Sequence, residues 1–255
     1  MQPYTDAMTE QNSITEQNAL NAAIIAALTR NPARVQRLTH AGQVLWIKRR
    51  EALRGLRRLQ KGNPSTAFAS ERSALHRLAE RDAPVPPILA EGANFFAIPD
   101  SGRPLSTLLT DGAPALPDQM TAFAAAGRAL AGLHGMGLSH GRPSLKDICW
   151  DGTRITFIDL ERYADHRNTP KGHAMDVIMF VFNGLAVGRG MTPEMQTAIA
   201  AYRASDSAGI WQLAQRWCRR MRWIDWVTKP AQWQPDGKAN EFKAIPLTLA
   251  TFCAP

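Results

Sequence analysis

Residues 138–161, LSHGRPSLKDICWDGTRITFIDLE, constrain the fold more than any other part of this sequence. They follow a predicted long helix over residues 117–136. Asp151-Gly152 stands between two apolar runs, and Asp-Gly in that context predicts a β-hairpin. Polar side chains gather at two places, over residues 140–147 before the hairpin and at Asp159 directly after it. The segment therefore predicts a helix, a polar loop, two short strands and a carboxylate, in that order.

This order and spacing resemble the catalytic loop of protein kinases, H-x-D-x-x-x-x-N, and the metal-binding aspartate that follows it. His140 matches the histidine of that pattern, and Asp159 matches the later aspartate. Two positions depart from it. Arg142 stands where the family has the aspartate that accepts the substrate hydroxyl proton, and arginine stays protonated and cannot be a general base. Asp147 stands in place of the asparagine.

Other parts of the pattern occur upstream and downstream. Lys48 ends a predicted strand, like the lysine that contacts nucleotide phosphates, and Glu71 opens the next helix, like the glutamate that pairs with that lysine. The stretch ERSALHRLAERDAPVPPIL and the sequence DLE at 159–161 resemble the Kdo/WaaP lipopolysaccharide kinases and aminoglycoside-phosphotransferase-like enzymes. Asp176 falls in a predicted helix, where kinase-like folds often keep an aspartate that braces the catalytic loop. The resemblance covers residues 34–185.

The resemblance implies an α+β, bilobal protein-kinase-like fold with a small β-containing N-lobe and a mainly helical C-lobe. Its implied boundaries are an N-terminal helical extension at 1–33, the N-lobe at 34–102 and the C-lobe at 103–255. The breaker-rich run over residues 99–104 favours a boundary there. ATP with Mg²⁺ is expected between the lobes.

The implied site residues are Lys48 and Glu71 for nucleotide binding, Asp147 and Asp159 as metal ligands, and Arg142, Asp147 and Asp159 for catalysis. Carboxylate oxygens are suitable ligands for Mg²⁺, and phosphoryl transfer needs positioning and charge neutralisation more than covalent chemistry. The sequence has no G-x-G-x-x-G loop, because the first predicted hairpin offers only Ala41-Gly42.

Several of these residues also have a structural interpretation. Asp147 is a candidate loop cap, Lys48 a candidate solvated lysine beside two arginines, and Glu71 an acid that suits the first turn of a helix. His140 is expected to be structural. For Arg142, the functional alternative is a bidentate contact with the transferred phosphate or an acidic substrate.

The remaining pattern predicts mostly short elements. We expect polar, frayed residues at 1–13, a helix over 14–30, a hairpin turning at 40–42, a helix over 66–81, strands at 88–90 and 95–98 around a turn at 91–92, and helices over most of 172–227.

The formal net charge of +8 favours anionic partners such as a nucleotide, a glycolipid or a phospholipid headgroup. A basic run, consisting of Arg49, Arg50, Arg54, Arg57, Arg58 and Lys61, is either a solvated face or a patch for such a partner. The Trp- and Arg-rich sequence over residues 211–227 is either a packed helix or an interfacial membrane helix. No nucleic-acid recognition motif accompanies the charge, so no nucleic-acid partner is expected.

The sequence contains neither an apolar run long enough to span a membrane nor a secretory signal, which predicts a cytoplasmic protein, with peripheral contact at the inner membrane as an open alternative. Three separated cysteines, Cys149, Cys218 and Cys253, favour reduced thiols. Two functions follow from the loop: an ATP-dependent phosphotransferase acting on a hydroxyl of a lipopolysaccharide core sugar or another small molecule, and a pseudokinase that binds nucleotide or a partner without transferring phosphate.

Overall fold

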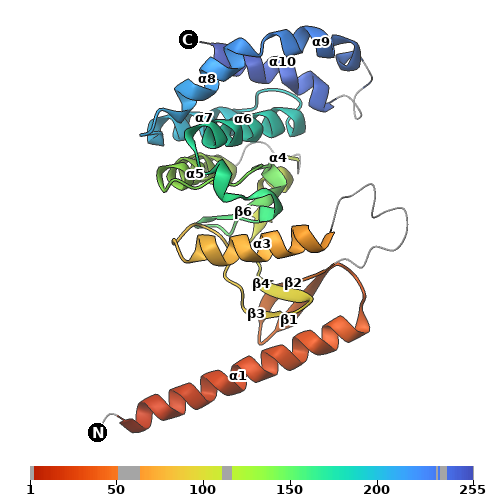
Figure 1. The fold of residues 1–255 in the computed structure, drawn as a ribbon, viewed down its shortest axis with the longest axis vertical. Coiled ribbons are helices and arrows are strands. Elements are labelled where there is room, and N and C mark those ends of the chain that lie inside the picture. Colours follow the sequence, from red (N-terminus) through yellow and green to blue (C-terminus); the bar gives the residue numbers. More distant parts are fainter. Residues whose placement is uncertain (1–2, 51–63, 111–116, 234, 236–239, 255) are drawn as a thin grey trace. The chain divides into compact units, whose positions relative to one another are not determined.

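The computed structural model describes residues 3–50, 64–110, 117–233, 235 and 240–254, and the chain forms two compact units (Figure 1). The first unit comprises Met1–His76 and Pro86–Asp100, and the second comprises Arg77–Val85 and Ser101–Pro255. Much of the predicted basic run, with Arg54, Arg57, Arg58 and Lys61, lies outside the described residues.

The first unit is a small antiparallel sheet with helices. Its elements are α1 (Pro3–Arg30), β1 (Val35–His40), β2 (Gln43–Arg49), α3 (Pro64–Ala79, whose last residues belong to the second unit), β3 (Ala90–Gly92) and β4 (Phe95–Pro99). The strand order is β1-β2-β4-β3. Ala41 and Gly42 both have positive φ and join β1 to β2, with His40 paired to Gln43. The predicted hairpin is confirmed, with its turn at residues 41–42 rather than over 40–42.

Helix α1 packs on this sheet through one face. Ile24 is fully buried against Ile47, Ala90 and Ala97. Leu20, Ala27 and Leu28 pack on the same cluster, at the three- and four-residue spacing that places side chains on one side of a helix. The helix begins at Pro3, so the expectation of frayed residues up to 13 was wrong; proline suits the first position of a helix.

The turn predicted at residues 91–92 was also displaced. Glu91 and Gly92 lie within β3, and Gly92 pairs with Phe95 across a turn at 93–94. A Cβ at Gly92 would come within 2.5 Å of the Phe95 ring. The glycine therefore makes room for an aromatic side chain on the partner strand.

The second unit is mainly helical around a three-stranded sheet. Its elements are β5 (Arg103–Pro104), α4 (Leu105–Thr110), α5 (Pro117–Gly135), η1 (Leu145–Asp147), β6 (Ile148–Trp150), β7 (Ile155–Phe157), η2 (Leu160–Arg162), η3 (Asp165–Arg167), α6 (Pro170–Val187), α7 (Pro193–Ser205), α8 (Ile210–Arg220), α9 (Trp223–Gln232) and α10 (Asn240–Cys253). The strand order is β5-β6-β7. The predicted helix after residue 117, the Asp151-Gly152 hairpin and the helical remainder are confirmed, as is the α+β class.

The helices of this unit pack around α6. Helix α5 packs with α7, and α6 packs with both α8 and α10 (Figure 1). Phe123, Phe180, Tyr202 and Phe252 are fully buried between them. Among the described residues, no helix combines the length and the apolar character needed to cross a bilayer.

Candidate functional site

Lys48 and Glu71 form an ion pair in the first unit, as the sequence predicts. Lys48 lies near the end of β2, opposite Phe96 of β4. Phe68 of α3 contacts Phe96, with ring centroids 5.3 Å apart, and Glu71 lies one helical turn after Phe68. The aromatic contact therefore sets the position from which the Glu71 carboxylate reaches the lysine.

Little of this ion pair is exposed: 19% of the Lys48 side chain and 6% of the Glu71 side chain. Lys48 is therefore not a solvated surface lysine. Removing either partner of such a buried ion pair would leave the other charge buried and uncompensated, which is strongly destabilising. The Lys48 ammonium has three N–H donors, and its hydrogen bond to Glu71 leaves donor capacity for a further anionic ligand.

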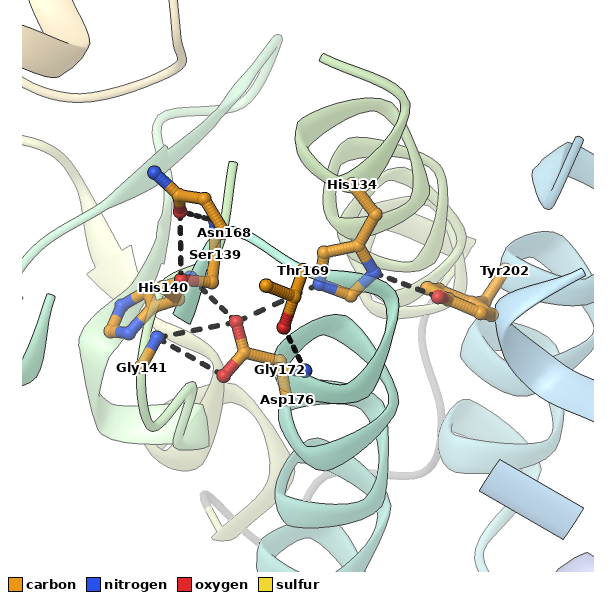
Figure 2. A network of polar contacts seen from close by, with 9 residues as sticks. All are labelled: His134, Ser139, His140, Gly141, Asn168, Thr169, Gly172, Asp176 and Tyr202. Atoms are coloured by element: carbon orange, nitrogen blue, oxygen red, sulfur yellow. Dashed lines mark hydrogen bonds and ion pairs between the residues drawn. The ribbon is translucent and has the colours of Figure 1, made fainter. Parts of the chain in front are cut away.

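The polar loop over residues 139–147 is held by α6 in the second unit. Asp176 accepts hydrogen bonds from the backbone N–H of His140 at 2.5 Å and of Gly141 at 3.0 Å (Figure 2). Asn183, seven residues further along α6 and therefore on the same face, accepts from the N–H of Leu145 at 2.7 Å. The predicted brace by Asp176 is confirmed, and Asn183 is a second brace that the sequence analysis missed.

Three further contacts fix the ends of the loop. The Asn168 side-chain oxygen accepts from both the N–H and the hydroxyl of Ser139 (Figure 2). His140 Nε2 lies 3.2 Å from the carbonyl oxygen of Ile158, and the N–H of Ile158 donates to the carbonyl of Asp147 at 2.9 Å. His140 therefore has the scaffolding position predicted for it, and it ties the loop to the end of β7.

Gly141 is required by this arrangement. Its φ is +96°, and a Cβ at this position would lie 2.3 Å from the carbonyl oxygen of Arg162. The loop therefore passes so close to the chain after β7 that only glycine fits.

Asp147 and Asp159 lie beside the same cation. The Lys146 ammonium is 3.6 Å from Asp147 Oδ1 and 3.6 Å from Asp159 Oδ2. Asp147 ends the short turn η1, and Asp159 follows β7, so the hydrogen bond between Ile158 and Asp147 brings the two carboxylates to one place. The structure thus brings together the two predicted metal ligands, with Lys146 between them as a cation that the sequence analysis did not single out.

The environment of Asp147 disfavours the ionised form of its carboxylate. Burial, and next the negative charge of Asp159, raise the pKa of Asp147 from 3.8 to about 6. Lys146 opposes this rise. A cation placed between the two carboxylates relieves both causes, because it replaces lost hydration and separates like charges.

Asp159 has a left-handed backbone conformation, with φ 60° and ψ 53°. Non-glycine residues adopt this region uncommonly, and such positions cluster at functional sites. The Asp159 side chain makes no capping hydrogen bond to the helical turn that follows it, and about a quarter of it is exposed. Its carboxylate is therefore available to a ligand.

Arg142 is half-buried in the loop, and among the described residues it has neither a hydrogen bond nor an ion pair. Its charge lowers the pKa values of both His140 and Asp147, although burial has the largest effect on each. The guanidinium is thus near the carboxylate group and retains its donors for another partner.

The two carboxylates suit Mg²⁺ better than a metal that needs a complete protein cage. Within the described ranges, no group of three or more His, Cys, Asp or Glu side chains gathers into a metal site. Mg²⁺ is commonly held by one or two carboxylates, with water and substrate phosphates completing its shell. Lys146, whose side chain is 62% exposed, can move aside for such an ion.

No model of a known protein family matches the chain. An uncharacterized protein of Haemophilus influenzae is 29% identical over 198 residues, which cover 77% of this chain and 81% of that protein.

Two solved structures also show similarity to this chain. One is a divergent kinase that lacks the glycine-rich loop, and this kinase regulates membrane ultrastructure of the Toxoplasma parasitophorous vacuole. It has a TM-score of 0.46 and 16% identity, and the match covers 72% of this chain and 78% of that one. The other is the bifunctional kinase-methyltransferase WbdD, with a TM-score of 0.45 and 16% identity, covering 68% of this chain and 42% of that one.

Proposed function

We propose that the chain is a kinase-like protein that binds ATP and transfers its terminal phosphoryl group to a hydroxyl acceptor. The observation that supports this most directly is the pair Asp147 and Asp159, two carboxylates drawn from different elements to one cation. The buried Lys48–Glu71 ion pair supports it independently, because kinases use such a pair to hold nucleotide phosphates.

In this proposal each residue acts through charge and position. Lys48, oriented by Glu71, donates to phosphate oxygens, while Asp147 and Asp159 hold Mg²⁺ in place of the Lys146 ammonium. The bound ion supplies charge neutralisation on the phosphate oxygens. Asp176 and Asn183 act on the loop backbone only, and they keep Asp147 at a fixed place relative to β7.

Arg142 takes a different role from the aspartate that the kinase pattern has at this position. Its unpaired guanidinium is suited to contact the transferred phosphate or an anionic acceptor, and phosphoryl transfer through a loose transition state demands little of a base. In this proposal Glu161, or Asp147 itself, is the carboxylate that assists the acceptor hydroxyl.

The alternative is a pseudokinase, and Arg142 is the observation that favours it. In that case the same residues bind nucleotide, and no phosphate is transferred because the proton-accepting carboxylate is missing. A lipopolysaccharide core sugar or another small molecule is the acceptor class for the active form, whereas the pseudokinase acts through a protein partner.

A transfer assay separates these two functions. Purified chain, radiolabelled ATP and Mg²⁺ are incubated with a panel of sugar, glycolipid and small-molecule acceptors. Transfer that is lost in both Lys48→Ala and Asp159→Ala, and retained in Glu80→Gln, is the expected result; Glu80 is an exposed carboxylate directly after α3. Steady transfer excludes the pseudokinase, and nucleotide binding without transfer to any acceptor supports it.

We also propose that α9 makes a peripheral contact with an anionic membrane surface. None of its residues is buried. Trp223 and Trp226 are 58% and 76% exposed, and with Val227 they follow the spacing of one helical face. Tryptophan side chains are favoured at the membrane interface. The cations at the start and near the end of this helix, Arg222 and Lys229, complement anionic headgroups.

Vesicle flotation tests this contact. Binding to vesicles of phosphatidylglycerol and phosphatidylcholine is expected to fall about tenfold in Trp223→Ser/Trp226→Ser, because two large apolar side chains no longer leave water. Ile25→Ser on α1, which removes an equally exposed apolar side chain, is the control. The contact is rejected if the wild type and the double variant bind the vesicles equally. It is also rejected if binding does not depend on the phosphatidylglycerol content of the vesicles.

A further inference from the structure

A cavity of about 360 Å³ lies on the second unit, and none of the residues that line it is one of the candidate site residues. Helix α6 contributes Lys171, Ala174 and Met175 to its wall, and α8 contributes Leu213, Arg216, Trp217 and Arg220. The α8 residues follow the three- and four-residue spacing of one helical face, so a continuous strip of α8 faces α6 here.

The wall combines three cations with apolar surface. Lys171, Arg216 and Arg220 are exposed, and within the described part of the chain none of them has an ion pair or a hydrogen bond. Among the residues that the structure describes, no acidic side chain lines the cavity. Three like charges around one cavity repel one another, and an anion inside it would reduce that repulsion.

The chemistry of the cations narrows the kind of anion. Two arginines supply planar guanidinium groups that match phosphate in a bidentate manner, and the lysine adds a compact point charge. Lys171 also lies in the first turn of the eighteen-residue helix α6, and the positive N-terminal end of that helix favours a bound anion as well. Phosphate satisfies more of these donors than a carboxylate does.

The apolar side of the wall indicates that the ligand is larger than a free ion. Trp217, Leu213 and Met175 provide flat and flexible apolar surface beside the cations. The volume lies within the range of small-molecule sites, whereas a single phosphate ion would fill only a part of it.

We propose that this cavity is a binding site for a phosphate monoester with an apolar or aromatic group, in which Arg216, Arg220 and Lys171 hold the phosphate and Trp217 contacts the organic part. The proposal does not rest on nucleotide binding or transfer by the candidate site. It adds to the nucleotide site a second anion site, which α6 and α8 form. Helix α6 connects the two sites in sequence, because the cavity residue Met175 precedes Asp176, which holds the polar loop.

Calorimetric titration of the full-length chain with phenyl phosphate tests the proposal. Saturable binding is expected, and Arg216→Gln/Arg220→Gln should weaken it at least about tenfold, because charge-assisted hydrogen bonds are lost. Arg219→Gln, which neutralises an exposed arginine of the same helix that does not line the cavity, should leave it unchanged. Asp159→Ala should also bind normally, which separates this site from the nucleotide site.

Trp217→Leu keeps the wall apolar and provides a second measurement. Its affinity for inorganic phosphate should be close to that of the wild type, while its affinity for phenyl phosphate falls. The proposal is overturned if phenyl phosphate does not bind at millimolar concentration, if the double variant binds as tightly as wild type, or if Arg219→Gln weakens binding equally.

The phosphate can come from a soluble metabolite or from a lipid headgroup, and vesicles containing phosphatidic acid distinguish the two sources. If the double variant loses affinity for phenyl phosphate and binds the vesicles as wild type does, the ligand is a soluble monoester. If it loses affinity for both, and Arg219→Gln loses neither, a lipid headgroup is the source.

Discussion

At the scale of single residues, Asp147 combines burial with a nearby like charge. Its side chain is 5% exposed, and both burial and Asp159 raise its pKa to about 6. Its ionised form therefore destabilises the folded state, since the unfolded chain keeps a value near 3.8. A purely structural role gives no reason to keep such a group, whereas a cation site does.

Asp147→Asn should accordingly stabilise the ligand-free protein. One pH unit of pKa change corresponds to about 1.4 kcal/mol, so the variant gains up to about 3 kcal/mol at pH 7.5. The gain should shrink as pH falls through 6 and vanish below about pH 3, where wild-type Asp147 is protonated in both states. Urea unfolding at a series of pH values measures this, with Glu80→Gln as the control. A destabilised variant at pH 7.5 would contradict the account.

Gly141→Ala belongs to the same scale. The added Cβ meets the Arg162 carbonyl at 2.3 Å and the backbone has positive φ, so a loss of roughly 2–4 kcal/mol in unfolding free energy is expected. Gly132→Ala, inside α5 with nothing within 4 Å of the new methyl group, should instead be neutral or stabilising by up to about 1 kcal/mol. Similar effects of the two substitutions would show that the loop is not as tightly placed as described.

At the scale of elements, α6 is the scaffold of the polar loop. Asp176 and Asn183 lie seven residues apart on one face of it, and they receive three backbone N–H groups of the loop. Asp176 is itself buried beside His134, whose Nε2 lies 3.7 Å from the carboxylate, and His134 contacts Tyr202 at 2.8 Å (Figure 2). The brace is therefore anchored in the helical core.

Removing the side chain of Asp176 or Asn183 should destabilise the polar loop locally, while the surrounding helices stay folded. Asp176→Ala leaves two N–H groups without an acceptor, which costs about 2–5 kcal/mol, and Asn183→Ala, which leaves one, costs about 1–3 kcal/mol. Hydrogen exchange should accelerate at residues 140–145 in both variants while α5 and α7 stay protected. Uniform acceleration across the unit would show that Asp176 supports the whole fold rather than the loop.

At the scale of the whole molecule, the local parts of the fold could be predicted and the long-range parts could not. The Asp151-Gly152 hairpin, the helix after residue 117 and the bracing Asp176 have local or resemblance-based signals. The start of α1 was misplaced because its polar first residues carry no apolar period, although the helix extends back to Pro3. The strand β3 was misplaced because a tertiary contact, the packing of Phe95 beside Gly92, decides it.

The candidate site shows the same division. The resemblance was enough to name Lys48, Glu71, Asp147 and Asp159, and the structure forms both pairs. It gave no indication of Lys146 between the carboxylates, although that residue adjoins Asp147 in the sequence. Asn183 had a weak signal in its seven-residue distance from Asp176. The cationic cavity had none, because Lys171 meets Arg216 and Arg220 only once α6 and α8 pack.

Calorimetric titration of the chain with ATP, with and without Mg²⁺, tests whether Lys48, Asp147 and Asp159 form a nucleotide site. The account predicts Mg²⁺-dependent binding that is lost in Asp159→Ala, weakened at least about tenfold in Lys48→Ala by loss of a charge-assisted contact, and unchanged in Arg216→Gln/Arg220→Gln. No binding at millimolar ATP, or binding that neither Asp159→Ala nor Lys48→Ala alters, would contradict it.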